Sequence, residues 1–354
     1  MSGERVTAVE VAIDSLHAFG RAAYDRVGVV SDDAERVVEV QLDADLRGVD
    51  THGFQRLPWY VDHLREGRNN PRPQFRPLRE TTVSLLLDAD NALGQLACVR
   101  LMERLLPKAA ASGLAVGATR NSNDWGCGAY YPLLAARAGF VCFATTTSVP
   151  TLAPYGARTR VVGNNPMVFA VPRRDTSPIV LDMALTPVAL GKVLRAMAEG
   201  APIPEEWGFR DTEGRPTTDA SAALGGVLPA IGGYKGTGLA LMMNVLAGVL
   251  PGGNHSSDVG VGRRGQFVLL ISPTLFDDGD VFDREVESMA TQVKAAEPLP
   301  GGDGPYLPGE LEERRAADAR ARGTIRYPRS VVRELSTMSR SLGIEAPAEF
   351  GRLP

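Results

Sequence analysis

The sequence has few of the residue types on which metal centres and disulfide frameworks depend. Its 354 residues include three cysteines and four histidines. The cysteines, Cys98, Cys127 and Cys142, are odd in number and form no CxxC pair, and no HExxH motif is present. We therefore expect no metal ion, no disulfide framework, and buried free thiols in a reducing compartment.

An excess of one charge and long apolar runs are also lacking. The formal net charge is −4, from 38 Lys and Arg against 42 Asp and Glu, so the composition predicts no basic surface for nucleic acid or acidic lipid. Neither a run of about 18 apolar residues nor a signal-peptide pattern is found. Together with a 44% hydrophobic content, these absences predict a globular cytoplasmic protein that acts on a small molecule.

Apolar residues at helical spacing dominate the first part of the chain. They predict helices over about 6–27, 31–46 and 54–66, with Ser31 as the N-cap of the second. Gly67 and the stretch RNNPRPQFRP then indicate a boundary. Beyond it, short apolar or β-branched runs predict strands in TTVSLLLDAD, GLAVGATRN, GFVCFATTTSV, NPMVFAVP, PIVLDMA and GQFVLLISP. Predicted helices alternate with these strands at about 94–112, 128–138, 187–199 and 237–250, and two more follow from Pro308 and over 330–342, so the middle of the chain reads as a mixed α/β sheet.

Two glycine-rich segments are candidate nucleotide sites. Gly260-Val-Gly262-Arg-Arg-Gly265 has GxGxxG spacing, but it precedes a predicted strand, whereas a Rossmann fingerprint follows a strand and opens a helix. We therefore interpret it as a loop. The segment GGYKGTG at 232–238 opens a predicted helix and carries Lys235, which suits a phosphate group. A flexible loop with a solvated lysine explains the same residues.

The segment GVDTHGFQR at 48–56 is a candidate substrate site. If a helix begins near Thr51, His52 and Arg56 lie four residues apart on one face. Arginine can hold a carboxylate with two hydrogen bonds while a histidine exchanges a proton at the adjacent carbon or heteroatom, which suits a 2-oxo or 2-hydroxy acid. The structural alternative is a helix capped by Asp50 or Thr51, with Arg56 in a surface ion pair.

The segment NSNDWGCGAYY at 121–131 places an acid, Asp124, among asparagines, a tryptophan and glycines. Asparagine and glycine before a helix form a tight turn with free N–H groups, where a ligand can bind. The alternative is a turn in which Asp124 is the N-cap of the helix. The local sequence does not separate the two.

Read together, these segments closely resemble the type 2 malate/L-lactate dehydrogenase family. The resemblance runs from about residue 40 to 325 and rests on DLRGVDTHGFQR, NSNDWGCGAYY, TLAPYG, GNNPMVFAVP, IVLDMALTPVALGKV, IPEEWGFRDTEGRPTTD, LPAIGGYKGTGLALMM and LPGELEERR. It implies an intertwined homodimer with a non-Rossmann mixed α/β fold, NAD or NADP as cofactor, and a small carboxylate substrate. It also implies a division into an N-terminal helical segment (1–75), a mixed-sheet core (76–299) and a C-terminal helical segment (300–354) that packs on the first.

The resemblance also assigns roles to individual residues. His52, in the Thr51-His52-Gly53 motif, becomes the proton donor with Thr51 as its polar neighbour, Lys192 matches a lysine common in hydroxy-acid dehydrogenases, and Arg56 holds the substrate carboxylate. Asn164 and Leu190 would line the substrate pocket. The residues assigned to the cofactor are Trp125, Gly126, Ser148, Asp182, Met183, Ala184, Lys235, Pro308, Gly309 and Glu310.

The chain departs from the family pattern at the 121–131 segment. Members commonly read NSxHFG, and here Asp124 stands in place of the histidine and Trp125 in place of the phenylalanine. An aspartate, with an ordinary pKa near ~4, acts as a base or as the partner of a cation, so a substrate amine or iminium beside Asp124 is one hypothesis. Leu190, where several relatives carry histidine or arginine, makes that wall apolar and argues against a second substrate carboxylate.

These features predict an NAD(P)H-dependent reductase of a C=O or C=N bond next to a carboxylate. Its products would be 2-hydroxy acids or cyclic amino acids. The rival hypothesis is a regulatory or nucleotide-binding homodimer of the same fold, impaired in catalysis by the changes at Thr51, Asp124 and Asn164.

Overall fold

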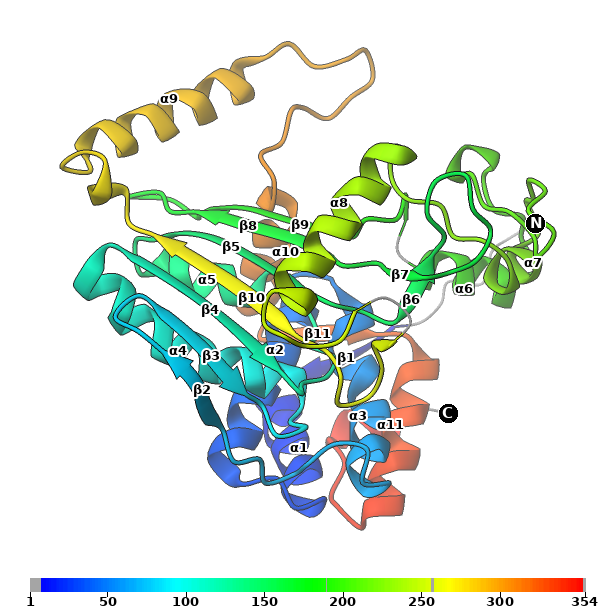
Figure 1. Ribbon diagram of the computed structural model, residues 1–354. Helices are drawn as coiled ribbons and strands as arrows, with labels where there is room; N and C mark the ends of the chain where they lie inside the picture. Colours follow the sequence, from blue (N-terminus) through cyan, green and yellow to red (C-terminus); the bar gives the residue numbers. More distant parts are fainter. Residues whose placement is uncertain (1–7, 189, 256–257, 353–354) are drawn as a thin grey trace.

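A seven-stranded mixed sheet forms the centre of the protein, as the computed structural model shows for residues 8–188, 190–255 and 258–352 (Figure 1). The strand order is β2-β3-β4-β10-β5-β8-β9. In the described part of the sheet only β3 and β4 pair in parallel, whereas Rossmann sheets are mostly parallel. The strands are β2 (Arg76–Glu80), β3 (Ser84–Asp88), β4 (Leu114–Arg120), β5 (Val141–Thr146), β8 (Met167–Val171), β9 (Ile179–Met183) and β10 (Gln266–Ile271).

Helices cover both faces of this sheet. Side chains alternate along a strand, so Val268 and Leu270 of β10 face one layer and Phe267 faces the other. The first layer is α4 with α5, and the second is α8 with a π-helical turn, η4, whose Ala247 packs against Phe267 (Figure 1). These elements are α4 (Gly94–Ser112), α5 (Tyr130–Arg137), α8 (Tyr234–Asn244) and η4 (Val245–Val249).

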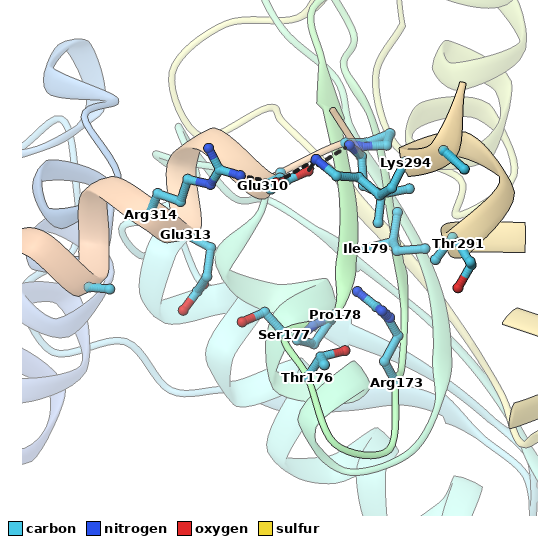
Figure 2. A pocket seen from close by; sticks show the side chains of 16 residues that line it. Arg173, Thr176, Ser177, Pro178, Ile179, Thr291, Lys294, Glu310, Glu313 and Arg314 are labelled. Carbon is cyan, nitrogen blue, oxygen red and sulfur yellow. Dashed lines mark hydrogen bonds and ion pairs between the residues drawn. The ribbon is translucent and has the colours of Figure 1, made fainter. Parts of the chain in front are cut away.

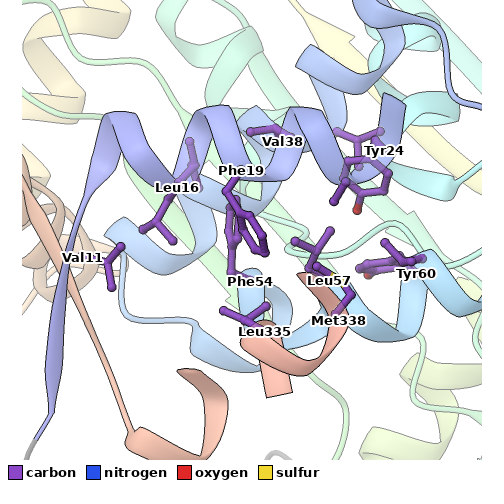
Figure 3. Packing of buried hydrophobic residues seen from close by; sticks show 14 of the residues in the cluster. Val11, Leu16, Phe19, Tyr24, Val38, Phe54, Leu57, Tyr60, Leu335 and Met338 are labelled. Carbon is purple, nitrogen blue, oxygen red and sulfur yellow. The ribbon is translucent and has the colours of Figure 1, made fainter. Parts of the chain in front are cut away.

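The two ends of the described chain share a second hydrophobic core (Figure 3). Leu16 and Phe19 near the start of the chain pack in the same cluster as Leu335 and Met338 near its end. A two-stranded antiparallel pairing of β1 with β11 reinforces this contact. The elements are β1 (Val9–Ala12), α1 (Ile13–Arg26), α2 (Ser31–Leu46), α3 (Leu57–Arg65), α10 (Glu310–Arg322), β11 (Thr324–Tyr327), α11 (Arg329–Leu342) and the 3-10 turn η7 (Ala348–Arg352).

A third cluster lies beside α8, and one helix extends away from the sheet. The short β6–β7 pair, α6 and α7 pack around Leu185 and Phe209. By contrast α9 buries only Val286 and Ala290 among its described residues and projects from the body of the molecule (Figure 1). The elements are β6 (Pro150–Leu152), β7 (Val162–Gly163), α6 (Leu190–Glu199), η3 (Glu205–Trp207), α7 (Ala220–Gly225), η6 (Pro273–Leu275) and α9 (Asp280–Ala295).

The structure confirms the six predicted strands and corrects several predictions about the helices. The first helix was predicted from Val6, which lies outside the described residues, and strand β1 occupies part of that range before α1 begins at Ile13. Helix α2 has the predicted bounds, but its N-cap is Val30 rather than Ser31. Helix α9 and strand β2 were not predicted, because α9 has little buried surface and all five residues of β2 are exposed. Among the described residues no helix is both long and apolar enough to span a bilayer.

Candidate active site

A cavity of about 540 Å³ lies where the N-terminal turns, the 124–129 loop and the end of β9 meet. Its wall brings together residues that are far apart in the sequence. Most of the predicted site residues line it: Thr51, His52, Arg56, Asp124, Trp125, Gly126, Ser148, Asn164, Asp182, Ala184, Leu190, Pro308 and Gly309.

His52 sits at the end of a short 3-10 turn rather than within a helix. A continuous helix from near Thr51 does not form: the chain makes two 3-10 turns, η1 (Asp50–His52) and η2 (Phe54–Arg56), before α3, because Gly53 between them has an extended ψ of −145°. The helix predicted from Phe54 therefore begins as η2 and is α-helical only from Leu57. The Thr51 hydroxyl lies 3.0 Å from His52 Nδ1. That contact orients the ring and leaves Nε2 without a protein partner among the described residues, so Nε2 can meet a ligand.

A buried acid of α2, Asp45, packs against Gly53 and fixes its position. Asp45 accepts hydrogen bonds from the Phe54 N–H (2.8 Å) and the Tyr327 hydroxyl (2.5 Å). A Cβ on Gly53 would lie 1.9 Å from Asp45 Oδ1, so no larger residue fits without a shift. Burial raises the pKa of Asp45 to about 7, against the opposing hydrogen bonds from Tyr327 and Phe54. Asp45 thus couples the His52 turn to the C-terminal strand β11.

Arg56 presents a guanidinium to the cavity that has no acidic partner within the salt-bridge distance among the described residues. It lies over the Trp59 ring, 4.6 Å from the centroid, which holds the side chain in place by a cation–π contact. Its Nε is buried without a hydrogen-bond acceptor in the described part of the chain. A buried donor without a partner is costly, so this group is suited to an incoming carboxylate.

Asp124 is held on three sides by the protein itself. Tyr60 donates to Oδ1 (2.8 Å), the Gly126 N–H donates to the same oxygen (3.1 Å), and Arg264 Nη1 donates to Oδ2 (2.6 Å). Burial raises the pKa of the Asp124 carboxyl, but the charges of Arg264, His52 and Arg56 outweigh that effect and hold the pKa well below its usual range. Asp124 is therefore ionised at neutral pH.

These contacts decide between the readings of Asp124. It does not cap the following helix, because α5 begins at Tyr130 with Ala129 as its N-cap. The bond to Gly126 closes a local turn instead. One hypothesis from the sequence was that a substrate amine or iminium is the cationic partner of Asp124. In the structure that partner is Arg264 of the protein itself.

Arg264 is a site residue that the sequence did not reveal. It belongs to the GxGxxG segment, which is a loop as predicted, leading into β10. The Arg264 backbone pairs with Ser122 in both directions (3.0 and 2.9 Å), and Asn123 Oδ1 accepts the Gly262 N–H at 2.7 Å. This pairing sets the arginine beside Asp124, a contact between residues 140 positions apart that no local pattern signals.

Asp182 forms the floor of the cavity at the end of β9. Its side chain is exposed in the open cavity, and its Oδ2 accepts the Ala129 N–H (2.9 Å) at the start of α5. The surrounding protein partly desolvates the carboxylate and so raises the pKa of Asp182, while the Ala129 hydrogen bond and the proximity of His52 oppose that effect. Asp182 thereby positions the 124–129 loop against the strand.

Four predicted site residues lie outside this cavity. Lys192 is exposed on α6, Met183 packs into the cluster around α6–α8, and Lys235 is exposed at the start of α8. Glu310 instead lines a neighbouring cavity of about 700 Å³. For Met183 the reason is strand alternation, because Asp182 and Met183 point to opposite faces.

The neighbouring cavity lies between α9, the turn before β9 and the start of α10 (Figure 2). It shares Pro308 and Gly309 with the first cavity. Glu310 accepts from Lys294 (2.9 Å) and pairs with Arg314, so its carboxylate organises this cavity rather than pointing freely into it. Gly309 has φ +82°, and a Cβ there would lie 2.8 Å from the Val180 carbonyl oxygen, so the turn needs glycine to approach β9.

Comparison with known proteins identifies the family. The model of the malate/L-lactate dehydrogenase family matches residues 11–336. The chain belongs to the malate/L-lactate dehydrogenase family. The prediction from the sequence motifs is therefore confirmed, and so are the mixed α/β fold of this family and the assignment to dehydrogenases.

Individual members of the malate/L-lactate dehydrogenase family resemble this chain over most of its length. Malate dehydrogenase from Pyrococcus horikoshii is 34% identical over 350 residues, 95% of this chain and 96% of the relative, and its solved structure superposes with a TM-score of 0.89. Ureidoglycolate dehydrogenase (NAD(+)) from Escherichia coli is 34% identical over 320 residues, 87% of this chain and 91% of the relative. The structure of delta1-piperideine-2-carboxylate reductase from Pseudomonas syringae has 28% identity and a TM-score of 0.84, covering 94% of this chain and 100% of the other.

Proposed function

We propose that this chain is an NAD(P)-dependent dehydrogenase that interconverts a 2-oxo acid and its 2-hydroxy acid, or reduces a cyclic imino acid. The observation that carries the proposal is the joint placement of His52 and Arg56 on one cavity wall, with the arginine free of any acidic partner among the described residues. A proton donor beside a carboxylate-binding fork matches a substrate whose reacting carbon adjoins the carboxylate.

The two adjoining cavities fit an elongated dinucleotide. Ser148, Trp125, Gly126, Asp182 and Ala184 line the first, and Pro308 and Gly309 join it to the second, where Glu310 lies. The buried Thr151 hydroxyl on the first wall has no hydrogen-bond partner in the described residues, which leaves a polar group for a ligand. When bound, the nicotinamide supplies or accepts the hydride. Lys235 remains a predicted phosphate contact, which a partner subunit or a shift of its loop would have to bring to the cofactor.

The protein residues then have separate tasks. Arg56 orients the carboxylate, and His52 Nε2 gives a proton to the carbonyl oxygen or imine nitrogen as that atom gains electron density. Asp124 is a poor proton donor near neutrality because it is ionised, so His52 carries the proton transfer. Leu190, with 41% of its surface exposed, gives the substrate side chain an apolar wall.

The test is oxidation of NADH and of NADPH with a panel of 2-oxo acids and cyclic imino acids, followed by the reverse reaction with the matching hydroxy acids. Turnover that depends on His52 and Arg56 supports the proposal. Nucleotide binding without turnover of any acid would favour the rival hypothesis of a regulatory nucleotide-binding protein.

We also propose that the chain forms a homodimer in the cytoplasm. Large apolar side chains are exposed along α8 and η4, including Met242 (55%), Val249 (49%) and the following Leu250 (66%). Several large apolar side chains exposed along one helical segment are typical of an interface, and identical subunits most often pair as symmetric dimers. Sedimentation velocity of the native chain and of Met242→Lys tests this, and a native monomer at micromolar concentration would contradict it.

A further inference from the structure

We infer that Asp124 and Arg264 form a charge-compensating pair that restricts the substrate to a single anionic group. Arg264 could bind a second anionic group of a substrate, but the carboxylate of Asp124 already occupies that position. The inference rests on the proposed function, because it names the substrate class of the same cavity.

The pair is built into the wall and is not a chance surface contact. Arg264 Nη1 and Asp124 Oδ2 lie 2.6 Å apart, and the two side chains retain only 15% and 17% of their exposed surface. Tyr60 and the Gly126 N–H hold the other oxygen of Asp124, and pairing with Ser122 holds the Arg264 backbone. Asp124 cannot turn away without breaking three hydrogen bonds, and the fixed backbone of Arg264 keeps the base of its side chain beside that carboxylate.

The other charged groups of the cavity leave one cation for the substrate. Arg47 is paired with Asp43 and Glu313, each at 2.9 Å. The two remaining acids, Asp182 and Glu312, add no positive charge. His52 is assigned to the proton transfer. Of the arginines on the described cavity wall, Arg56 is the one that has no carboxylate within 4.0 Å, so it is the cation left for the substrate.

A substrate with two anionic groups therefore meets an unfavourable site. Its second carboxylate or sulfonate would compete with Asp124 for Arg264. The displaced carboxylate of Asp124 would then lie beside that second anionic group and repel it. The apolar side chain of Leu190 offers no hydrogen bond in compensation. Simple 2-oxo acids with an uncharged side chain avoid this conflict.

The experiment compares kcat/KM for pyruvate, which carries one charge, with that for oxaloacetate, which carries two. Asp124→Asn keeps the acceptor oxygen for Tyr60 and Gly126 but frees Arg264, so the oxaloacetate-to-pyruvate ratio should rise at least about tenfold. Arg264→Gln should lower the ratio. The double variant restores the net charge of the pair to zero and should return the ratio towards the native value. Glu103→Gln removes the ion pairs of Glu103 with Arg36 of α2 and Arg100 of α4, none of which lines the cavity; it is the matched control and should leave the ratio unchanged.

Binding provides a readout that does not require turnover. Calorimetry measures the affinities for oxamate (one charge) and tartronate (two charges) on protein saturated with NADH. The tartronate-to-oxamate ratio of affinities should rise in Asp124→Asn, fall in Arg264→Gln and return towards the native value in the double variant. A native enzyme that reduces pyruvate but shows no change of ratio in Asp124→Asn overturns the inference and leaves the proposed function intact. A native protein that binds NADH but neither reduces a 2-oxo acid nor binds oxamate overturns the proposed function instead. If Asp124→Asn fails to fold, the lowered ratio in Arg264→Gln decides, and an unchanged ratio there counts against the inference.

Discussion

The protein should lose stability as the pH rises because of Asp45, a buried acid next to the candidate active site, and replacing Asp45 by asparagine should remove that loss. Asp45 is buried below the His52 turn, where it accepts hydrogen bonds from Phe54 and Tyr327, and its second oxygen, Oδ1, has no partner among the described residues. Burial raises its pKa from the ordinary 3.8 to about 7. The folded protein thus prefers the protonated acid, whereas the unfolded chain ionises near 3.8.

The sign and size of the effect follow from that difference. An acid whose pKa is raised on folding contributes its stability fully below the unfolded pKa, and loses it as the pH rises towards the folded pKa. At about 1.36 kcal/mol per pH unit, the interval from 3.8 to about 7 corresponds to on the order of 4 kcal/mol. The loss falls between about pH 4 and pH 7 and levels off above pH 7.

Asparagine keeps an oxygen that can accept both hydrogen bonds and cannot ionise. Its NH2 group lacks an acceptor, which lowers the stability of the variant by roughly 1–3 kcal/mol. This cost is the same at every pH, so it shifts the difference in stability between the two proteins by a constant. The measurement is the free energy of unfolding in urea at pH 4, 5, 6, 7 and 8 for the native protein and Asp45→Asn. Their difference should move in favour of the variant as the pH rises to 7. Tyr327→Phe removes one hydrogen bond that lowers the pKa, so it should extend the loss to higher pH. A difference that stays constant across this range would refute the reasoning.

Three further predictions concern the turn that carries the proposed proton donor and carboxylate ligand. His52→Gln should lower kcat by roughly 10²–10⁴ with little change in NADH affinity, and near-native turnover would remove His52 from the mechanism. Arg56→Lys replaces a planar fork by a point charge, so KM for a 2-oxo acid should rise roughly 10- to 100-fold while kcat falls less; equal KM values would show that Arg56 binds elsewhere. Gly53→Ala places a Cβ 1.9 Å from Asp45 and should cost about 1–3 kcal/mol and reduce kcat, whereas Gly225→Ala, with no atom closer than 4.0 Å, should do neither.

Local patterns in the sequence predicted the sheet well, because its strands carry their own signal. Each central strand is a short run of β-branched and apolar residues bounded by turn residues, and it folds where that pattern stands. The exceptions are elements whose stability comes from distant partners. Strand β1 was read as helix because it exists only through pairing with β11, over 300 residues later in the chain. Helix α9 was missed because it has little contact with the described body of the protein.

The site was predicted where the chain resembles its family and missed where it departs from it. His52, Arg56 and Asp182 were assigned from motifs and line one cavity. The structure answers the question raised by Asp124 with Arg264, whose segment was correctly interpreted as a loop and therefore set aside as a site. A long-range ion pair has no period and no spacing, so a single sequence could not reveal it.

Contacts around the cavity also tie the site to the packing of the chain ends. Asp124 joins Tyr60 of the N-terminal helices to Arg264 of the loop before β10, Asp45 bonds to Tyr327 of β11, and Arg47 bonds to Glu313 of α10. The bonds of Asp124 form only when the terminal helical layer has docked on the sheet, whereas those of Asp45 and Arg47 join the N-terminal and C-terminal parts of that layer to each other. Arg56, the proposed carboxylate ligand, and His52, the proposed proton donor, both belong to that layer, while the floor of the cavity belongs to the sheet. The cavity is therefore complete only when that layer is docked, and any change that loosens the shared core of Leu16, Phe19 and Leu335 should weaken substrate binding as well as stability.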